Sequence, residues 1–281
     1  MQTRHEVIFS DARTAELEEG SVDLVVTSPP YPMIEMWDEM FSRMDREIEE
    51  ALEKDEGEEA FELMHGILDE VWETVDSALK EGGIVCINVG DATRKIGGDF
   101  RMFSNHFRII EFFRSRGYRQ LPGILWRKPA NSAAKFMGSG MLPPNAYVTL
   151  GHEHILVFRK GGNRSFDSKE KRYSSAYFWE ERNTWFSDLW EDVNGTLQQL
   201  ESSELRDRSA AYPLEIPYRL INMYSLQGDT VLDPFWGTGT TTLAAIASAR
   251  NSIGIEVEEE FSQVFERELD RIKQTTRQIN R

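Results

Sequence analysis

The pattern of hydrophobic positions predicts a series of short strands separated by helices. Apolar residues run almost without interruption through VDLVVT (22–27) and GIVCINV (83–89), which is typical of strands buried on both faces. Further predicted strands are HEVIFSDA (5–12), which ends near Asp11, LPGILWRK (121–128) and HEHILVFRKG (152–161). Polar residues, glycine or proline flank each of them, as expected where turns begin.

Helical spacing dominates residues 36–79, where apolar side chains recur every three or four positions and acidic residues occupy the other face. The KDEGEE segment (54–59) is expected to divide this region into two helices. Another amphipathic helix is predicted over 102–118 and ends at Gly117, because glycine readily adopts the left-handed conformation of a helix end. PLEIPYRLINMYS (213–225) predicts a further helix.

The C-terminal part has a regular order of strand, turn, helix and strand. DTVLDPF (229–235) and SIGIEV (252–257) are the predicted strands, and a glycine-rich turn followed by a helix over 236–251 connects them. This order favours parallel strands joined by a right-handed crossover. A last helix is predicted over 258–273.

Two central segments lack this regularity. Residues 129–151 are rich in Gly, Pro, Ser and Asn, and residues 161–208 are irregular and aromatic. Long irregular loops within compact domains are usually functional or disordered. These segments therefore interrupt an otherwise regular α/β pattern.

Composition narrows the classes of protein. Cys86 is the single cysteine, which excludes an internal disulfide framework and a multi-cysteine zinc site. Its apolar surroundings predict a buried core residue. The chain has no apolar run of about 18 residues, so no membrane span is expected. We also find no signal peptide, and we predict a cytoplasmic protein.

The net charge of −16 is unevenly distributed. Residues 35–81 contain 18 acidic and 4 basic side chains, whereas residues 91–135 contain 10 basic and 3 acidic ones. A nucleic-acid enzyme is expected to carry basic surface. The asymmetry allows a positive face beside an acidic one.

The first chemical motif is TSPPY, which follows the strand predicted over 22–27. Pro29 and Pro30 cannot donate to a sheet ladder because they lack N–H groups, so they end the strand in a rigid corner. The corner is either a plain structural turn or a preset pocket. In the second case Ser28 and the backbone carbonyls would face a ligand.

The second motif is DPFWGTGTTT (233–242), where a buried strand meets a glycine turn and a helix. Glycine allows close backbone approach, and helix N-terminal amides can receive an anionic group. Glu256 ends the next predicted strand, where an acid suits two ribose hydroxyls. The motif is neither GxGxxG nor a Walker loop. It predicts binding of a nucleotide-like ligand, with a structural turn as the alternative.

Together, TSPPY and DPFWGTGTT resemble the motifs of the S-adenosylmethionine-dependent methyltransferases that modify exocyclic amino groups of bases in nucleic acids. The catalytic motif precedes the cofactor motif, as in the permuted β group of that family. The resemblance implies an α/β, Rossmann-like class I methyltransferase fold, with a mostly parallel sheet and helices on both faces. Residues 1–126 would form the catalytic half of the core, 127–208 an inserted target-recognition region, and 209–281 the cofactor-binding half.

The resemblance also implies roles for individual residues. The family's catalytic motif is matched by Ser28, Pro29, Pro30 and Tyr31. The implied S-adenosylmethionine site comprises Asp11, Thr27, Pro213, Asp233, Phe235, Gly237, Gly239, Thr240 and Glu256. No metal is expected, because two histidines on one strand, His152 and His154, do not form a metal site without further ligands.

The chemistry explains this choice of residues. The lone pair of an exocyclic amine is conjugated with the base, so hydrogen-bond acceptors must favour its rotation and pyramidalisation. The Ser28 hydroxyl and the Pro29 carbonyl are the expected acceptors, and the prolines preorganise them. Tyr31 is expected to stack on a base flipped out of the duplex.

Serine at the first position favours cytosine N4 over adenine N6, because aspartate is the commoner partner of adenine in the resembled family. The predicted function is site-specific methylation of cytosine N4 in DNA, of the restriction-modification type. Three alternatives remain: the same reaction on RNA such as rRNA, N6-adenine methylation of DNA, and a non-catalytic S-adenosylmethionine-binding subunit. Nucleic acid is the expected partner, with no membrane, and the resemblance allows a homodimer.

Overall fold

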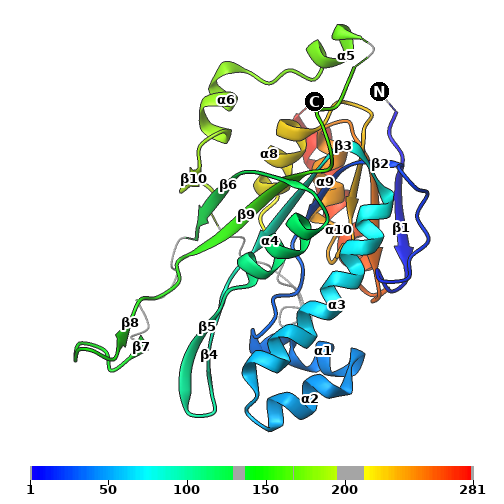
Figure 1. Ribbon diagram of the computed structural model, residues 1–281. Coiled ribbons are helices and arrows are strands. Elements are labelled where there is room, and N and C mark those ends of the chain that lie inside the picture. The colour runs from blue at the N-terminus through cyan, green and yellow to red at the C-terminus, as the bar shows by residue number, and fades with distance from the viewer. Residues whose placement is uncertain (1, 129–136, 167, 195–211, 280–281) are drawn as a thin grey trace.

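A single large sheet forms the centre of the molecule (Figure 1). The computed structural model describes residues 2–128, 137–166, 168–194 and 212–279. The strands of the sheet are β1 (His5–Phe9), β2 (Val22–Thr27), β3 (Leu79–Val89), β6 (Arg119–Arg127), β9 (His152–Arg159), β10 (Leu189–Trp190), β11 (Thr230–Asp233) and β12 (Asn251–Glu256). Their order is β1-β12-β11-β2-β3-β9-β6-β10. The first five strands in this order are mutually parallel, and β9 runs antiparallel to both of its neighbours.

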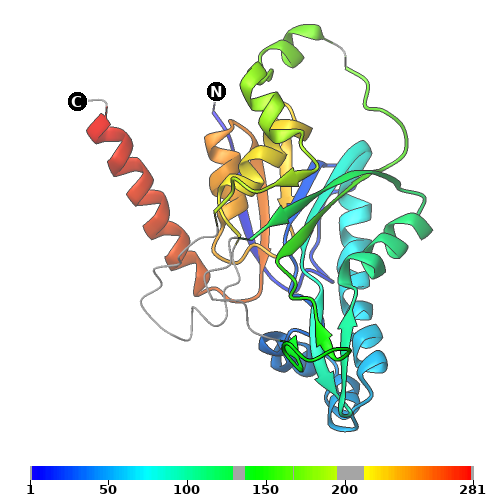
Figure 2. The ribbon, with the colours of Figure 1, turned by 90° about the vertical axis from the view of Figure 1, so that its left-hand side faces the viewer.

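Helices cover both faces of the sheet (Figures 1 and 2). The helices are α1 (Asp38–Met44), α2 (Arg46–Glu53), α3 (Gly57–Ala78), α4 (Asn105–Ser115), α5 (Lys169–Tyr173), α6 (Trp179–Trp185), α8 (Glu215–Tyr224), α9 (Thr240–Ala247) and α10 (Phe261–Ile279). Val25 of β2 packs in the core under α3 and α4, whereas Leu24 and Val26 pack in the core under α8 and α9. Both faces of β2 are therefore buried, which explains its uninterrupted apolar sequence. The predicted α/β fold, mostly parallel with helices on both faces, is confirmed.

The strand order interleaves the two ends of the chain. β11 and β12 from the C-terminal part lie between β1 and β2 from the N-terminal part. β11 also pairs directly with β2, with Leu232 opposite Val25. Because the carboxyl ends of parallel strands lie at the same edge, the residues after β2 and after β11 are brought side by side.

Two regions differ from the sequence prediction. Residues 36–79 form three helices instead of two, because Asp45 adopts an extended conformation and caps α2 by accepting from Glu47 N. Residues 92–103 form a hairpin of β4 (Ala92–Ile96) and β5 (Asp99–Phe103), so the following helix begins at Asn105. Gly97 and Gly98 both have positive φ at the hairpin turn, which explains why this sharp reversal is possible.

A second hairpin lies beside the first, beyond the carboxyl edge of the sheet (Figures 1 and 2). It consists of β7 (Met137–Gly138) and β8 (Ala146–Tyr147). Tyr147 stacks on Phe100 of β5 with ring centroids 4.5 Å apart and an interplanar angle of 10°. The stacked pair links the predicted target-recognition segment to the catalytic half. Residues 129–136, 167 and 195–208 of that segment lie outside the described residues.

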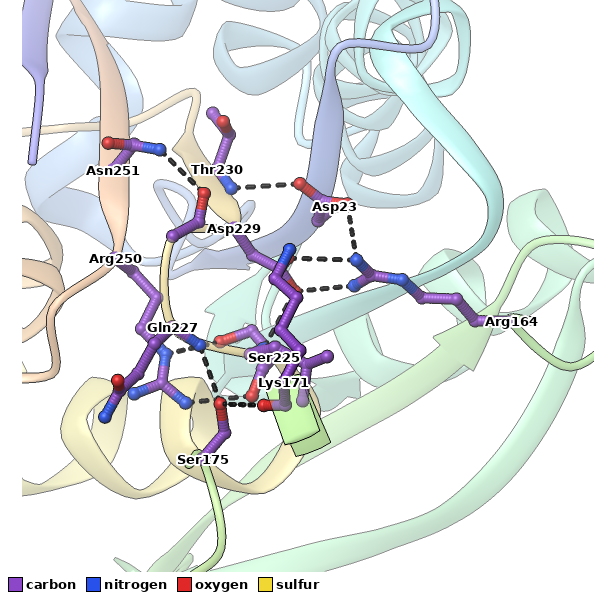
Figure 3. Close-up of polar contacts among 12 residues, drawn as sticks. Asp23, Arg164, Lys171, Ser175, Ser225, Gln227, Asp229, Thr230, Arg250 and Asn251 are labelled. Carbon is purple, nitrogen blue, oxygen red and sulfur yellow. Dashed lines mark hydrogen bonds and ion pairs between the residues drawn. The ribbon is translucent and has the colours of Figure 1, made fainter. Parts of the chain in front are cut away.

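The segment around α5, residues 164–166 and 168–175, contacts the opposite edge of the sheet through the interactions drawn in Figure 3. Arg164 donates to both carboxylate oxygens of Asp229, at 2.5 and 2.9 Å, and lies 3.3 Å from Asp23. Both acids are at the amino ends of parallel strands. Burial acts to raise the pKa of Asp229, but hydrogen bonds from Arg164 outweigh it and hold this pKa below its ordinary value. Part of the predicted target-recognition region is thus anchored away from TSPPY.

A cavity of about 910 Å³ lies beside this anchor, and Arg164, Phe166, Tyr173 and Tyr224 contribute to its lining. It is separate from the edge that carries both sequence motifs. Among the described helices, none is long and apolar enough to cross a membrane.

Candidate active site

The SPPY corner follows β2 and has a tightly packed backbone. Pro29 and Pro30 are buried, and Ser28 is half-buried. A Cβ placed on Gly90, at the end of β3, would lie 3.0 Å from the Tyr31 ring, so glycine allows the ring its position. Met33, two residues beyond the motif, is buried and has a φ of +65°. Left-handed backbone at a bulky residue costs roughly 1–2 kcal/mol and persists where the surroundings impose it.

The Tyr31 hydroxyl lies at the centre of a buried polar cluster. Ser28 Oγ is 3.0 Å away, and Asn88 Nδ2 donates to the same hydroxyl at 3.0 Å. The hydroxyl itself donates to Glu153 Oε2 at 3.1 Å, and Asn88 Nδ2 donates to that carboxylate oxygen at 2.6 Å. Lys128 pairs with the other oxygen of Glu153. The catalytic motif is therefore joined to β3, β9 and the end of β6.

Asp233 connects the two motifs. Its carboxylate accepts from Thr27 Oγ1 at 2.6 Å, from Thr241 Oγ1 at 2.5 Å and from Phe235 N at 3.1 Å. Only 2% of Asp233 is exposed, and burial raises its pKa to about 6 despite these donors. Thr27 directly precedes Ser28, so Asp233 ties the cofactor loop to the catalytic corner.

Glu256 shapes the other side of the loop. One carboxylate oxygen accepts from Gly237 N at 2.8 Å, and the other accepts from Val257 N at 2.9 Å and Glu258 N at 3.0 Å. Burial is the main cause that raises the pKa of Glu256. The carboxylate remains half-buried beside the loop, at the end of β12.

The remaining predicted cofactor residues lie on the elements that surround this loop. Asp11 follows β1, and its carboxylate accepts from both the backbone N–H and the guanidinium of Arg13. The hydrogen bond from the Arg13 side chain is the main cause that lowers the pKa of Asp11. Pro213 precedes α8, and its neighbour Tyr212 is hydrogen-bonded to Thr241 at 2.6 Å. Phe235 packs edge-on against Trp72, whereas Thr240 begins α9.

These residues suit a nucleoside-like cofactor. Among the described residues, a Cβ placed on Gly237 would have only the Phe235 carbonyl within 4 Å, at 3.9 Å, so these residues leave space beside the loop. The partly exposed acids Asp11 and Glu256 end neighbouring parallel strands next to that space. Hydroxyl donors such as a ribose diol match such acceptors. These acceptors thus fit the ribose hydroxyls of S-adenosylmethionine, and the contacts of single residues remain predictions.

A histidine cluster adjoins the site. His106 Nδ1 is 2.8 Å from both Asp91 oxygens, and His154 Nε2 lies 3.7 Å from Asp91. Burial acts to raise the pKa of Asp91, but the interactions with both histidines outweigh it and lower this pKa. The imidazoles stack at 4.0 Å with an interplanar angle of 13°. One ligand atom from each of Asp91, His106 and His154 lies within 4.8 Å of the others, which is a spacing that a metal site could use. The expectation of no metal stays a prediction.

Sequence reasoning missed Asn88, Lys128 and Glu153. Asn88 is the last residue but one of the apolar strand GIVCINV, and Glu153 occupies a buried position of β9 between two half-buried histidines. A carboxylate at an inward-facing strand position was the available signal, because such groups are rarely buried without partners. Its partner could not be read from the sequence, since Tyr31 is 122 residues away.

Comparisons with known proteins agree with this geometry. Residues 22–267 match the family model for DNA methylases. The type II methyltransferase M.MthZI of Methanothermobacter thermautotrophicus is 54% identical over 285 residues, which cover 100% of this chain and 79% of that protein. M.MjaI of Methanocaldococcus jannaschii, also a type II methyltransferase, is 52% identical over 280 residues, covering 95% and 91%.

A solved structure extends the similarity to three dimensions. The DNA modification methylase TTHA0409 from Thermus thermophilus, described as putative and crystallised with S-adenosyl-L-methionine, superposes with a TM-score of 0.74 at 31% identity. The match covers 95% of this chain and 93% of that one. The sheet order, the two linked motifs and these matches lead to one conclusion: this chain belongs to the DNA methylase family, the S-adenosylmethionine-dependent amino-methyltransferases of the N4 and N6 type.

Proposed function

We propose that this DNA methylase transfers a methyl group to N4 of a cytosine within a short DNA sequence, as part of restriction-modification protection. The observation that carries the choice of base is Ser28 at the first position of the catalytic motif. It contributes a neutral hydroxyl where aspartate would be expected for adenine. The cytoplasm is the proposed location, and a homodimer remains a proposal that sedimentation of the purified protein would test.

The residues of the pocket would act on the amine in three ways. Ser28 Oγ and the Pro29 carbonyl accept hydrogen bonds from the amino group and favour its pyramidal form. The rigid diproline holds these acceptors in place before the base arrives. Tyr31 offers its ring to the flipped base. When bound at the Asp233–Glu256 loop, S-adenosylmethionine supplies an electrophilic methyl group on its sulfonium.

The decisive experiment identifies the methylated nucleoside. The protein is incubated with labelled S-adenosylmethionine and, separately, with unmethylated DNA and with total RNA. Each polymer is then digested and the labelled nucleoside is identified by mass. N4-methylcytosine in DNA is expected. N6-methyladenine in DNA would overturn the base assignment, and label in RNA alone would overturn the polymer. Label in neither, with cofactor binding intact, would indicate a non-catalytic subunit.

Substitution of Ser28 tests the catalytic role directly. Ser28→Ala should retain S-adenosylmethionine affinity in calorimetry and lose most methylation, because an acceptor for the amine is removed. Ser174→Ala is the matched control, since its hydroxyl donates only to the Lys171 carbonyl of α5 among its described contacts. Unchanged turnover of Ser28→Ala would refute the role of Ser28.

A further inference from the structure

Glu153 is a buried carboxylate in contact with the catalytic motif. It is 5% exposed and accepts from both Tyr31 and Asn88, while Lys128 pairs with its other oxygen. Glu153 is thus the acidic partner of an ion pair, with Lys128 at one oxygen and hydrogen-bond donors at the other. An ionised carboxylate can only accept hydrogen bonds, so it dictates the direction of every bond that it shares.

This constraint propagates to Ser28. Since Glu153 only accepts, the Tyr31 hydroxyl must donate its single proton to that carboxylate. Burial, followed by the charge of Glu153, raises the pKa of Tyr31 well above its ordinary value, so the phenol stays a donor. The Tyr31 oxygen then accepts from Asn88 Nδ2 and from the Ser28 hydroxyl, each at 3.0 Å. The proton of Ser28 is directed at Tyr31. Asn88 Nδ2 lies 3.5 Å from Ser28 Oγ, and the second lone pair of this oxygen remains available.

Asn88 is oriented by the same carboxylate. Its NH₂ group faces Glu153, Tyr31 and Ser28, because a flipped amide would bring its oxygen against Glu153 Oε2. The amide oxygen is buried, and no donor from the described residues reaches it. Beside Tyr31 the described residues therefore leave acceptor capacity on Ser28 Oγ and Asn88 Oδ1, and an amino group is the ligand chemistry that such acceptors match.

We propose that Glu153 is a positioning residue that sets the hydrogen-bond polarity of the catalytic pocket, so that Ser28 Oγ accepts an N–H of the target amine. The inference rests on the proposed methylation of an exocyclic amine, and it holds for cytosine N4 and adenine N6 alike. The proposal gives Glu153, which is distant in sequence from both motifs, a part in selecting a base that carries an amino group.

Glu153→Gln tests the proposal with little change in shape. The new amide can donate to Tyr31, which reverses the chain of bonds and turns the Ser28 proton toward the base. Single-turnover methylation should fall by about 10- to 100-fold, the range for a lost hydrogen bond to a charged group. S-adenosylmethionine affinity should stay unchanged. Glu62→Gln, which removes a carboxylate bound by Arg108 outside the pocket, is the matched control.

A binding measurement separates polarity from a merely structural role. Two duplexes carry the site mapped for the wild-type protein, one with the natural target base and one with its analogue lacking the amino group: 2-pyrimidinone for cytosine or purine for adenine. The wild type should prefer the natural duplex, and Glu153→Gln should lose this preference. Equal preference and equal rate in the variant would overturn the proposal. Weaker binding of both duplexes by the same factor would also overturn it.

A second variant covers the case in which Glu153→Gln fails to fold. Tyr31→Phe removes the link to Ser28 but leaves Glu153 paired with Lys128 and Asn88. It should show the same loss of preference, and retained preference would contradict the proposed chain of bonds. Absence of methylation by the wild type itself would refute the proposed function instead, so the two failures are distinguishable.

Discussion

Asp233 illustrates how a motif residue can act through its neighbours. The sequence suggests a direct cofactor ligand, but its carboxylate is surrounded by donors from Thr27, Thr241 and Phe235. Such a buried acid stabilises the geometry of the loop, and its ionisation is opposed by burial. Tyr31 and Glu153 also act through contacts, because Tyr31 lies between Ser28 and the Glu153 carboxylate.

The raised pKa of Asp233 predicts a specific pH dependence of stability. The folded form binds this proton up to about pH 6, whereas the ordinary value is 3.8. The folded state therefore holds more protons between these values, and the contribution of Asp233 to the free energy of unfolding falls as pH rises through this window. Between pH 4 and pH 7, the free energy of unfolding of the wild type should fall by up to about 3 kcal/mol relative to that of Asp233→Asn.

Chemical denaturation of both proteins at the two pH values measures this difference. Asp192→Asn serves as a contrast, because the hydrogen bond from Arg219 lowers the pKa of Asp192. Its contribution is present above the ordinary value and is lost as pH falls, so its trend should be opposite. A wild-type advantage over Asp233→Asn that does not change with pH would contradict the assignment.

At the scale of elements, the turn between β11 and α9 uses its two glycines differently. Both have positive φ, +51° at Gly237 and +76° at Gly239. A Cβ on Gly239 would clash with Phe265 and lie 2.9 Å from Trp236, whereas a Cβ on Gly237 would meet no described atom closer than the Phe235 carbonyl at 3.9 Å. Gly239 therefore serves the packing of the turn, and Gly237 borders the space expected for the cofactor.

Alanine at the two positions should separate these roles. Gly237→Ala should cost about 1–2 kcal/mol of stability, from the left-handed backbone alone, and should weaken S-adenosylmethionine binding. Gly239→Ala should destabilise the fold more strongly, because the clash forces α9 or its neighbours to move. Denaturation and calorimetry measure the two effects. Equal destabilisation, with undisturbed cofactor binding by Gly237→Ala, would refute this division.

For the whole molecule, the interleaved sheet makes the two halves dependent on each other. β12 lies between β1 and β11, and β11 lies between β12 and β2. Within the sheet, β1 is separated from the other described strands of residues 1–126, and the paired strands β11 and β12 of residues 209–281 lie between β1 and β2. The halves should therefore unfold as one cooperative unit, even though the sequence separates them by a variable segment.

Native-state hydrogen exchange tests this cooperativity. Amides of β2 and β3 should share their opening free energy with amides of β11 and β12. Amides of the β7–β8 hairpin serve as an internal reference and should exchange faster, since this hairpin lies beyond the sheet. Distinct opening free energies for the two pairs of strands would show that the halves open separately.

Much of this organisation could be predicted, because its signals are local. Each predicted feature follows from a short stretch of sequence. These features are the buried strands with continuous apolar residues, the diproline corner and the glycine turn. The β4–β5 hairpin could not be predicted in this way. Its polar strands lack a buried face with a clear period, and Met102 and Phe103 continue the helical pattern of α4 into it.

The sequence by itself determined the α/β class, the buried strands and the identity of the two motifs, since these depend on hydrophobic period and on the special backbone of proline and glycine. Only the tertiary structure decided which side chains meet. Strand pairing brings Glu153 to Tyr31 across 122 positions and Thr27 to Asp233 across 206. Such contacts depend on sheet order and register, which no local pattern encodes, and the proposed polarity of the catalytic pocket rests on them.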